Sequence, residues 1–312
     1  MIGKITGTGS CVPERIVENQ EIAKWVETSD AWIRERTGVL RRHIADGETT
    51  VSMAAIAAKR ALNNAGVDAK EIDLLIVATL SSNIIVPSTA CEVQKEIHAE
   101  RAVCFDLNAA CTGFLFAYNT VQAYISAGMC EKALVIGAET LSDMTDWTDR
   151  STCILFGDGA GAVVVEAGEG DFYPMIMHSN GKKGHALFCR SSLGKQREYI
   201  QMDGQEVFKF AVRKVPEVIS EVLRSAQLTV NDIDFFVLHQ ANQRIVQAVA
   251  KRLKTEISRI PMNLMEYGNT SSASIPLLLD ELHRGGRLKR GQIIVLAGFG
   301  GGLSWGASVL KW

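Results

Sequence analysis

A thiol, an imidazole and a carboxamide, far apart in the sequence, are the side chains best suited to chemistry in this chain. Cys111 lies in DLNAACTGFLF, where small residues lead into an apolar helical run that ends near Gly128. His239 follows a strand-like run in VLHQAN, and Asn269 lies in YGNTSSA. At a helix amino terminus, unpaired N–H groups and a partial positive charge lower the pKa of a cysteine. Each residue alone has a commoner structural role, but the three together favour a cysteine nucleophile.

The composition is that of an ordinary globular protein. The chain has 312 residues, of which 47% are hydrophobic and 22% charged, enough for two lobes around a large core. The net charge of −2 disfavours a nucleic-acid binder, which usually carries a basic domain. No stretch approaches the roughly 18 apolar residues of a membrane span, and the first residues follow a strand pattern with no signal-peptide core. We therefore expect a cytoplasmic protein.

The sequence repeats itself at long range. ALNNAGVDAKEIDLLIV at 61–77 resembles VLRSAQLTVNDIDFFVL at 222–238, and each reads as a helix end, an acidic turn and a buried strand. Two β-rich runs, at 133–138 and 293–298, are separated by nearly the same offset, and a glycine turn with a further strand follows each of them. These patterns predict an α/β protein of two related halves, residues 1–170 and 171–312, with helices covering mixed sheets. If the halves pack about a pseudo-twofold axis, Cys111 of the first half can converge with His239 and Asn269 of the second where the sheets meet.

Two segments, 25–48 and 142–152, lie outside the repeat and are expected to form walls of the active site. FGDGAG at 156–161 lacks the strand, G-x-G-x-x-G and helix order of a dinucleotide-binding unit, so we assign it to packing near the repeat axis.

The cysteines and histidines predict neither a disulfide framework nor a metal site. Seven cysteines are an odd number, and no two have the Cys-x-x-Cys spacing of a zinc site. None of the six histidines lies four residues from another, the spacing that builds a metal-binding helix face. We expect no metal and no cofactor.

These segments, in this order, resemble a known family. TGTGSCVP at 6–13, DAWIRERTG at 30–38, the Cys111 segment, FGDGAG, HQAN at 239–242, GNTS at 268–271 and FGGG at 299–302 are similar to motifs of the β-ketoacyl-acyl-carrier-protein synthase III family of condensing enzymes. The resemblance runs nearly the whole length of the chain. It implies a thiolase-like fold, with two pseudo-symmetric α/β halves in a layered α-β-α-β-α core, and a homodimer.

The resemblance also implies a reaction. An acyl-CoA primer and malonyl-acyl-carrier-protein undergo a decarboxylative Claisen condensation to a 3-oxoacyl-acyl-carrier-protein, which initiates type II fatty acid synthesis. Cys111 attacks the primer thioester and becomes S-acylated. His239 and Asn269 then donate neutral hydrogen bonds to the enolate oxygen that forms as CO2 leaves, so that no base is needed. Elongating synthases have a second histidine here and thiolases use a second cysteine as base, so Asn269 favours the decarboxylating, CoA-primed branch.

Further residue roles are implied by the same resemblance. The N–H groups of Cys111 and Gly301 form the oxyanion hole of acyl transfer. Trp32 and Arg36 hold the adenine of CoA, where an indole stacks on a purine beside a guanidinium. An amphipathic surface helix is the alternative reading of this pair. The remaining CoA contacts are assigned to Arg150, Gly204 and Asn242.

A basic surface and one apolar side chain complete the implied site. The helix expected from Ala241 onward places its cationic residues on a shared side, which resembles the family's docking surface for the acidic carrier protein, although a solvated helix face explains these charges equally well. The surface is assigned to Lys209, Arg244, Lys251 and Arg252. Val86 stands where many members have a phenylalanine that closes the acyl pocket of the neighbouring subunit, so we expect tolerance of a primer longer or bulkier than acetyl.

Other functions share part of this pattern. A paralogue that transfers an acyl group to oxygen or nitrogen, or that condenses a starter unit of specialised, polyketide-type metabolism, retains Cys111 and His239. Asn269 and the basic helix favour condensation on a carrier protein. A non-catalytic scaffold is disfavoured because no catalytic position is lost.

Overall fold

The structure is a computed structural model that describes residues 1–190 and 198–312. Its helices are α1 (Asn19–Ile22), α2 (Asp30–Thr37), α3 (Thr50–Ala65), α4 (Thr89–Ile97), α5 (Gly113–Ser126), α6 (Arg150–Cys153), α7 (Gly204–Ser225), α8 (Gln243–Leu253), α9 (Leu264–Tyr267) and α10 (Ser274–Arg284). Its strands are β1 (Ile2–Cys11), β2 (Ile16–Glu18), β3 (Arg41–His43), β4 (Leu74–Ala78), β5 (Val103–Leu107), β6 (Lys132–Glu139), β7 (Gly159–Gly168), β8 (Met175–Ser179), β9 (Leu187–Phe188), β10 (Gln201–Met202), β11 (Phe235–Leu238), β12 (Ile293–Gly300) and β13 (Ser304–Lys311). Four short 3-10 turns also matter below: η1 (Ala69–Glu71), η2 (Ala110–Thr112), η5 (Val230–Asp232) and η7 (Ser271–Ala273).

Two mixed sheets form the framework, and their strand orders correspond. The first sheet has the order β1-β7-β6-β4-β5 and the second the order β11-β12-β13-β8. In the first sheet β4 is parallel to β5 and β6, while β7 is antiparallel to β6 and β1. In the second, β11 is parallel to β12, and β13 is antiparallel to β12 and β8. Strands β4-β6-β7-β1 of the first sheet therefore match β11-β12-β13-β8 of the second in order and in relative direction.

The repeat in the sequence is also a repeat of structure. The offset that carries position 61 to position 222 also carries the first residues of η1, β4 and β6 to those of η5, β11 and β12. The same offset relates η2 and α5 to η7 and α10. Two pseudo-symmetric halves are thereby confirmed. The boundary between residues 170 and 171 stays a prediction, within the stretch from the end of β7 at Gly168 to the start of β8 at Met175.

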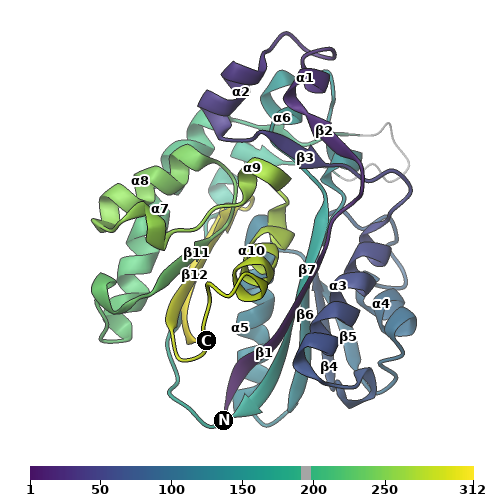
Figure 1. Ribbon diagram of the computed structural model, residues 1–312, viewed down its shortest axis with the longest axis vertical. Helices are drawn as coiled ribbons and strands as arrows, with labels where there is room; N and C mark the ends of the chain where they lie inside the picture. Colours follow the sequence, from purple (N-terminus) through teal and green to yellow (C-terminus); the bar gives the residue numbers. More distant parts are fainter. Residues whose placement is uncertain (191–197) are drawn as a thin grey trace.

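Helices form three layers around the two sheets (Figure 1). α3 and α4 cover the outer face of the first sheet, α7 and α8 cover that of the second, and α5 and α10 lie between the sheets. This is the expected α-β-α-β-α arrangement. At one end of the layers lie α1, α2, α6 and the two-stranded sheet of β2 and β3, and both chain termini lie at the opposite end (Figure 1).

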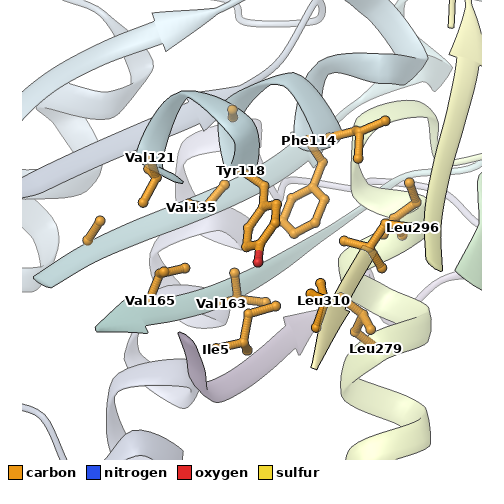
Figure 2. Close-up of a cluster of buried hydrophobic side chains, with 14 of the residues drawn as sticks. Ile5, Phe114, Tyr118, Val121, Val135, Val163, Val165, Leu279, Leu296 and Leu310 are labelled. Carbon is orange, nitrogen blue, oxygen red and sulfur yellow. The ribbon is translucent and has the colours of Figure 1, made fainter. Parts of the chain in front are cut away.

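The central layer is held by apolar side chains from both sheets. Phe114 of α5 packs in one cluster with Val163 of the first sheet and with Leu296 and Leu310 of the second (Figure 2). Burying a side chain of this size contributes roughly 1.5–3 kcal/mol, so contacts on both sides fix α5 firmly. Because Cys111 lies directly before α5, this packing also fixes the position of the nucleophile's backbone.

The outer helices follow from local sequence signals. α3 begins with a capping box between Thr49 and Ser52, and its buried face consists largely of alanine, which lets it lie close to β1 and β7. α8 buries Ile245, Val249 and Leu253, the apolar stripe that its spacing predicts. Within residues 1–190 and 198–312, we find no helix with both the length and the apolar character that a membrane crossing requires.

Candidate active site

A cavity of about 1660 Å³ lies beside the amino terminus of α5, and all three predicted catalytic side chains line it. Cys111, His239 and Asn269 are 7%, 1% and 7% exposed. Cys111 belongs to η2 of the first half, whereas His239 follows β11 and Asn269 precedes η7 in the second half. The convergence expected from pseudo-symmetry thus holds, and the residues' individual roles remain to be proposed below.

The Cys111 thiol is more fully desolvated than the sequence suggested. Burial raises its pKa to about 11, and a negative charge on the Glu139 carboxyl would act in the same direction. The nearby Ser271 hydroxyl and the N–H groups of Cys111 and Gly301 lower the pKa without offsetting burial. The sequence predicted a lowered pKa from the helix amino terminus, and that prediction is wrong for this structure. Burial destabilises the thiolate more than the positive end of the helix stabilises it.

The glycine turn after β12 lies directly against the nucleophile. A Cβ atom at Gly300 would be 2.7 Å from the Cβ of Cys111, so no larger residue fits there without a shift. The N–H of Gly301 and the N–H of Cys111 both point at the sulfur. These are the two donors that the family resemblance assigns to the oxyanion hole.

The His239 ring is neutral and is oriented by a hydrogen bond with Ser274. Its Nδ1 lies 2.7 Å from the Oγ of Ser274, and the Gln240 N–H donates to the same oxygen at 3.4 Å. If the Ser274 hydroxyl donates its hydrogen to Nδ1, the hydrogen of the neutral ring is on Nε2. Burial lowers the pKa of His239 to about 3, so the ring stays neutral near pH 7. Phe299 packs edge-on against it, with ring centroids 5.1 Å apart.

Asn269 is oriented so that its amide nitrogen is the free end. Its Oδ1 accepts from the Ser271 N–H at 2.9 Å, and its backbone pairs with Leu155 and Gly157 at 2.8 and 3.1 Å. Among the described residues, nothing accepts a hydrogen bond from its Nδ2, which is left to donate into the cavity. FGDGAG, expected only to pack near the repeat axis, thus also holds Asn269 in place.

Trp32 lies in the wall of the cavity, and two arginine side chains lie near its ring. The guanidinium groups of Arg36 and Arg150 lie 5.9 and 5.1 Å from its ring centroid. Trp32, Arg36, Gly204 and Asn242 line the cavity, whereas Arg150 does not line it and donates to the backbone carbonyl of Glu27 at 3.1 Å. Four of the five residues assigned to CoA thus border the same cavity as Cys111.

Asn242 has a structural role beside its position in the wall. Its Oδ1 caps α8 by accepting from the Arg244 N–H at 2.8 Å, and its Nδ2 donates to the Arg36 carbonyl at 3.0 Å. The side chain therefore ties α8 to α2. One hydrogen of its amide group is left for a ligand.

The four basic residues assigned to carrier docking are exposed on α7 and α8. Arg244 lies over the Phe208 ring at 5.4 Å, and Arg252 donates to the Val212 carbonyl at 3.0 Å, so the two helices carry one continuous surface with Lys209 and Lys251. Phe208 also lines the cavity, which places this surface beside the cavity.

Val86 lies outside the cavity of its own chain. Its side chain is 86% exposed on the loop before α4, next to Ile85, which is 72% exposed. Its predicted role concerns the pocket of a neighbouring subunit, so that role stays a prediction.

The segments outside the repeat do supply cavity walls, as expected. Trp32, Arg36 and Thr37 come from the first of them, and Met144 and Ser151 from the second. Apolar residues line the inner part near Cys111, namely Leu80, Leu141, Met144, Phe156, Leu187 and Ile200.

Sequence reasoning missed the polar residues that support the catalytic side chains. Ser274 orients His239, Ser271 contacts both Asn269 and Cys111, and Glu139 lies behind them. The repeat could have pointed to this group. Its constant offset makes Ser272 the position equivalent to Cys111, and Gly300 the position equivalent to Glu139.

Comparison with known proteins agrees with this geometry. Models described as 3-oxoacyl-[acyl-carrier-protein (ACP)] synthase III and its C-terminal part match residues 105–181 and 223–312. The β-ketoacyl-[acyl-carrier-protein] synthase III of Clostridium acetobutylicum is 47% identical over 99% of this chain and 98% of its own length. The crystal structure of 3-oxoacyl-[acyl-carrier-protein] synthase III from Aquifex aeolicus VF5 has a TM-score of 0.96 at 44% identity, covering 99% of this chain and 100% of that one. The priming β-ketosynthase of the R1128 polyketide pathway has a TM-score of 0.95 at 37% identity, covering 99% and 96%. The chain belongs to the 3-oxoacyl-[acyl-carrier-protein] synthase III family.

Proposed function

We propose that this protein condenses an acyl-CoA primer with malonyl-acyl-carrier-protein and so initiates type II fatty acid synthesis. One observation carries the proposal: a buried thiol, a neutral imidazole and an oriented carboxamide line a single cavity. The names of the relatives, which are synthases acting with acyl carrier protein, support the same reaction class.

In the first half-reaction, the Cys111 sulfur attacks the thioester carbon of acyl-CoA. The bond from that carbon to the CoA sulfur breaks, and the thiol proton leaves with CoA as its free thiol. The carbonyl oxygen carries negative charge during the attack, and the N–H groups of Cys111 and Gly301 are placed to stabilise it. The product is an S-acyl cysteine.

In the second half-reaction, malonyl-acyl-carrier-protein loses CO2 and its electrons form an enolate. The Nε2–H of His239 and the Nδ2–H of Asn269 are the donors for the enolate oxygen, and both are neutral. The enolate carbon attacks the acyl cysteine, a carbon–carbon bond forms, and the Cys111 sulfur leaves as a thiolate that takes up a proton from water. Because CO2 departure generates the nucleophile, no base is required of the protein.

The CoA nucleotide is proposed to lie at Trp32, with Arg36 and Arg150 providing positive charge beside the indole. The pantetheine then passes Gly204 and Asn242 toward Cys111. No further cofactor or metal enters this reaction.

The acidic carrier protein is proposed to dock on the basic surface of α7 and α8. Binding through exposed charges is screened by salt, so the KM for malonyl-acyl-carrier-protein should rise with ionic strength while the KM for acyl-CoA changes less. The residues that carry this interaction are Lys209, Arg244, Lys251 and Arg252.

A homodimer and a cytoplasmic location are also part of the proposal. β5 is an edge strand, its first residue Val103 is 63% exposed, and an unpaired edge of this kind invites pairing with a second copy. The exposed Val86 would then reach the pocket of the partner. Val86→Phe should shift primer preference toward shorter chains, as measured with a series of acyl-CoA primers.

Starter-unit condensation in polyketide metabolism is the second candidate, favoured by the likeness to the R1128 priming enzyme. Acyl transfer to oxygen or nitrogen predicts an acylated acceptor and no release of CO2. Product analysis with malonyl-acyl-carrier-protein separates this acyl transfer from condensation, and a competition among acyl-CoA primers compares the starter preferences of the two condensations.

The decisive experiment treats acylation and condensation separately. Intact mass after incubation with acetyl-CoA should increase by one acetyl group in the wild type and not in Cys111→Ala. Asn269→Ala should still acylate, but should lose about 10²–10³ in the rate of CO2 release, the usual effect of removing one such donor. Acylation of the Cys111→Ala variant, or normal CO2 release by Asn269→Ala, would refute the assigned roles.

A further inference from the structure

The active site has a counterpart in the other half of the fold. η2 and η7 are related by the offset of the repeat, and their first residues, Ala110 and Ser271, share the same unusual φ of 48°. The position of Cys111 in η2 is taken by Ser272 in η7. The last residue of the neighbouring central strand is Gly300 beside Cys111 and Glu139 beside Ser272. Glu139 thus occupies the position at which the catalytic half has a glycine, Gly300.

Glu139 is fully buried and makes contacts with two segments of the site. Its Oε1 lies 2.7 Å from the Oγ of Ser272 in η7. Its Oε2 accepts from the Ser81 hydroxyl at 2.6 Å and from the Leu80 N–H at 3.1 Å, both in the loop after β4. The carboxyl group therefore connects the end of the first sheet to the η7 turn.

The hydrogens around this group can be counted. The Oγ of Ser272 lies within hydrogen-bond distance of two acceptors, the Oε1 of Glu139 and the Ala78 carbonyl at 2.8 Å, but a hydroxyl has one hydrogen to donate. If Glu139 carries a proton on Oε1, it donates to Ser272, and Ser272 donates to Ala78. Each contact then has its own hydrogen, whereas an ionised Glu139 leaves one contact without any.

The surroundings of Glu139 also favour the neutral form. Burial raises its pKa, and no cation of the described chain pairs with it. The titratable group that faces it is the Cys111 thiol, and the other side chains in contact are hydroxyls, those of Thr79, Ser81, Ser271 and Ser272. An ionised Glu139 would repel the thiolate that acyl transfer develops on Cys111, and a neutral acid avoids this repulsion.

The η7 turn links Glu139 to the reacting groups. The Ser271 N–H holds the Oδ1 of Asn269, and the Ser271 hydroxyl lies near enough to the Cys111 thiol to lower its pKa. A shift of the turn would therefore move a hydrogen-bond donor of the condensation and the environment of the nucleophile together.

We propose that Glu139 is a positioning residue, a neutral carboxylic acid that anchors η7 through Ser272 and thereby sets the geometry of Asn269 and Cys111. This inference rests on the proposed condensation for its kinetic consequence. Its structural content, a protonated buried carboxyl that anchors the turn, is independent of that reaction.

The test compares two substitutions at this position. Glu139→Gln keeps a neutral group whose Nε2–H donates to Ser272 and whose oxygen accepts from Ser81, so its kcat should stay within about threefold of the wild type. Glu139→Ala removes the anchor and should lower kcat by at least about tenfold with an unchanged KM for acyl-CoA. Asp280→Ala is the control, because Asp280 is a buried carboxyl on α10 outside the cavity and its loss should reduce stability without reducing kcat.

Two measurements need no carrier protein, and they distinguish failure of this inference from failure of the proposed reaction. The infrared difference spectrum of wild type minus Glu139→Gln at pH 7 should contain a carboxylic-acid C=O band. Alkylation of Cys111 by iodoacetamide should proceed normally in Glu139→Gln and slow down in Glu139→Ala. Carboxylate bands alone, a Glu139→Gln variant as slow as Glu139→Ala, or a fully active Glu139→Ala would each overturn the proposal. The band and the Glu139→Gln variant decide the matter even where Glu139→Ala does not fold.

Discussion

Replacing Gly300 by alanine should displace the nucleophile although the protein retains every catalytic side chain. The added Cβ would lie 2.7 Å from the Cβ of Cys111, 3.1 Å from its backbone nitrogen and 3.2 Å from its sulfur. Nonbonded carbon atoms prefer a separation of about 3.5–4.0 Å, so β12 and η2 must move apart by about 1 Å. The packing of α5 between two sheets resists that movement.

The expected size of the effect follows from this geometry. Overpacking of this kind costs roughly 1–3 kcal/mol of folding free energy. A misplacement of about 1 Å at a reacting atom lowers a rate by about 10²-fold. We therefore expect Gly300→Ala to fold with a reduced Tm and to acylate about 10²-fold more slowly, as measured by single-turnover intact-mass analysis with acetyl-CoA.

Gly301→Ala is the matched control. Its added Cβ would meet nothing closer than 3.4 Å, and alanine keeps the N–H that faces the sulfur. This variant should acylate within about threefold of the wild-type rate, since no neighbouring atom has to move. Wild-type acylation by Gly300→Ala, or an equal loss in both variants, would show that contact at Gly300 does not control the nucleophile's position.

Three further predictions concern charge and binding. Because the pKa of His239 is lowered to about 3, the unfolded chain takes up a proton below pH 6.5 that the native state does not, so about 2 kcal/mol of stability should be lost between pH 6.5 and 5. Urea unfolding at both pH values should show a smaller loss in His239→Gln. Alkylation of Cys111 should accelerate about tenfold per pH unit between pH 7 and 9, and a plateau there would contradict its raised pKa. Trp32→Ala should raise the KM for acyl-CoA about tenfold with kcat unchanged, while Trp32→Phe retains most of the affinity.

Much of the framework was predictable because the sequence contains the same pattern of elements twice. The strand and turn pattern at 61–77 and 222–238 predicted two related halves, and the structure has the same elements at the same offset. The convergence of Cys111 and His239 followed from that symmetry. The apolar run expected to end near Gly128 corresponds to α5, which ends at Ser126, and the helix expected from Ala241 onward corresponds to α8, which begins at Gln243.

What the sequence left open depends on contacts between distant segments. The amino terminus of α5 suggested a lowered pKa for Cys111, but the pKa depends on how completely the other half of the fold excludes water from the thiol. In the same way, the hydrogen bond from Ser271 to Asn269 is local, whereas the contact of Ser272 with Glu139 joins residues 133 positions apart. The spacing of residues along the chain reveals neither the burial of the thiol nor the contact between Ser272 and Glu139.

The two halves share a framework but differ at the ends of their central strands. Next to Cys111, Gly300 brings the backbone so close that the N–H of Gly301 reaches the sulfur, and the absence of a side chain makes this possible. Next to Ser272, the equivalent position carries Glu139, whose carboxyl group fills the corresponding space and fastens the turn that orients Asn269. The same pair of turns thus serves two purposes: one presents a nucleophile to backbone donors, and the other holds the side-chain donor that faces it. Exchanging the two residues, with glycine at 139 and glutamate at 300, should therefore abolish acylation as well as condensation, because each half would lose the residue that its task requires.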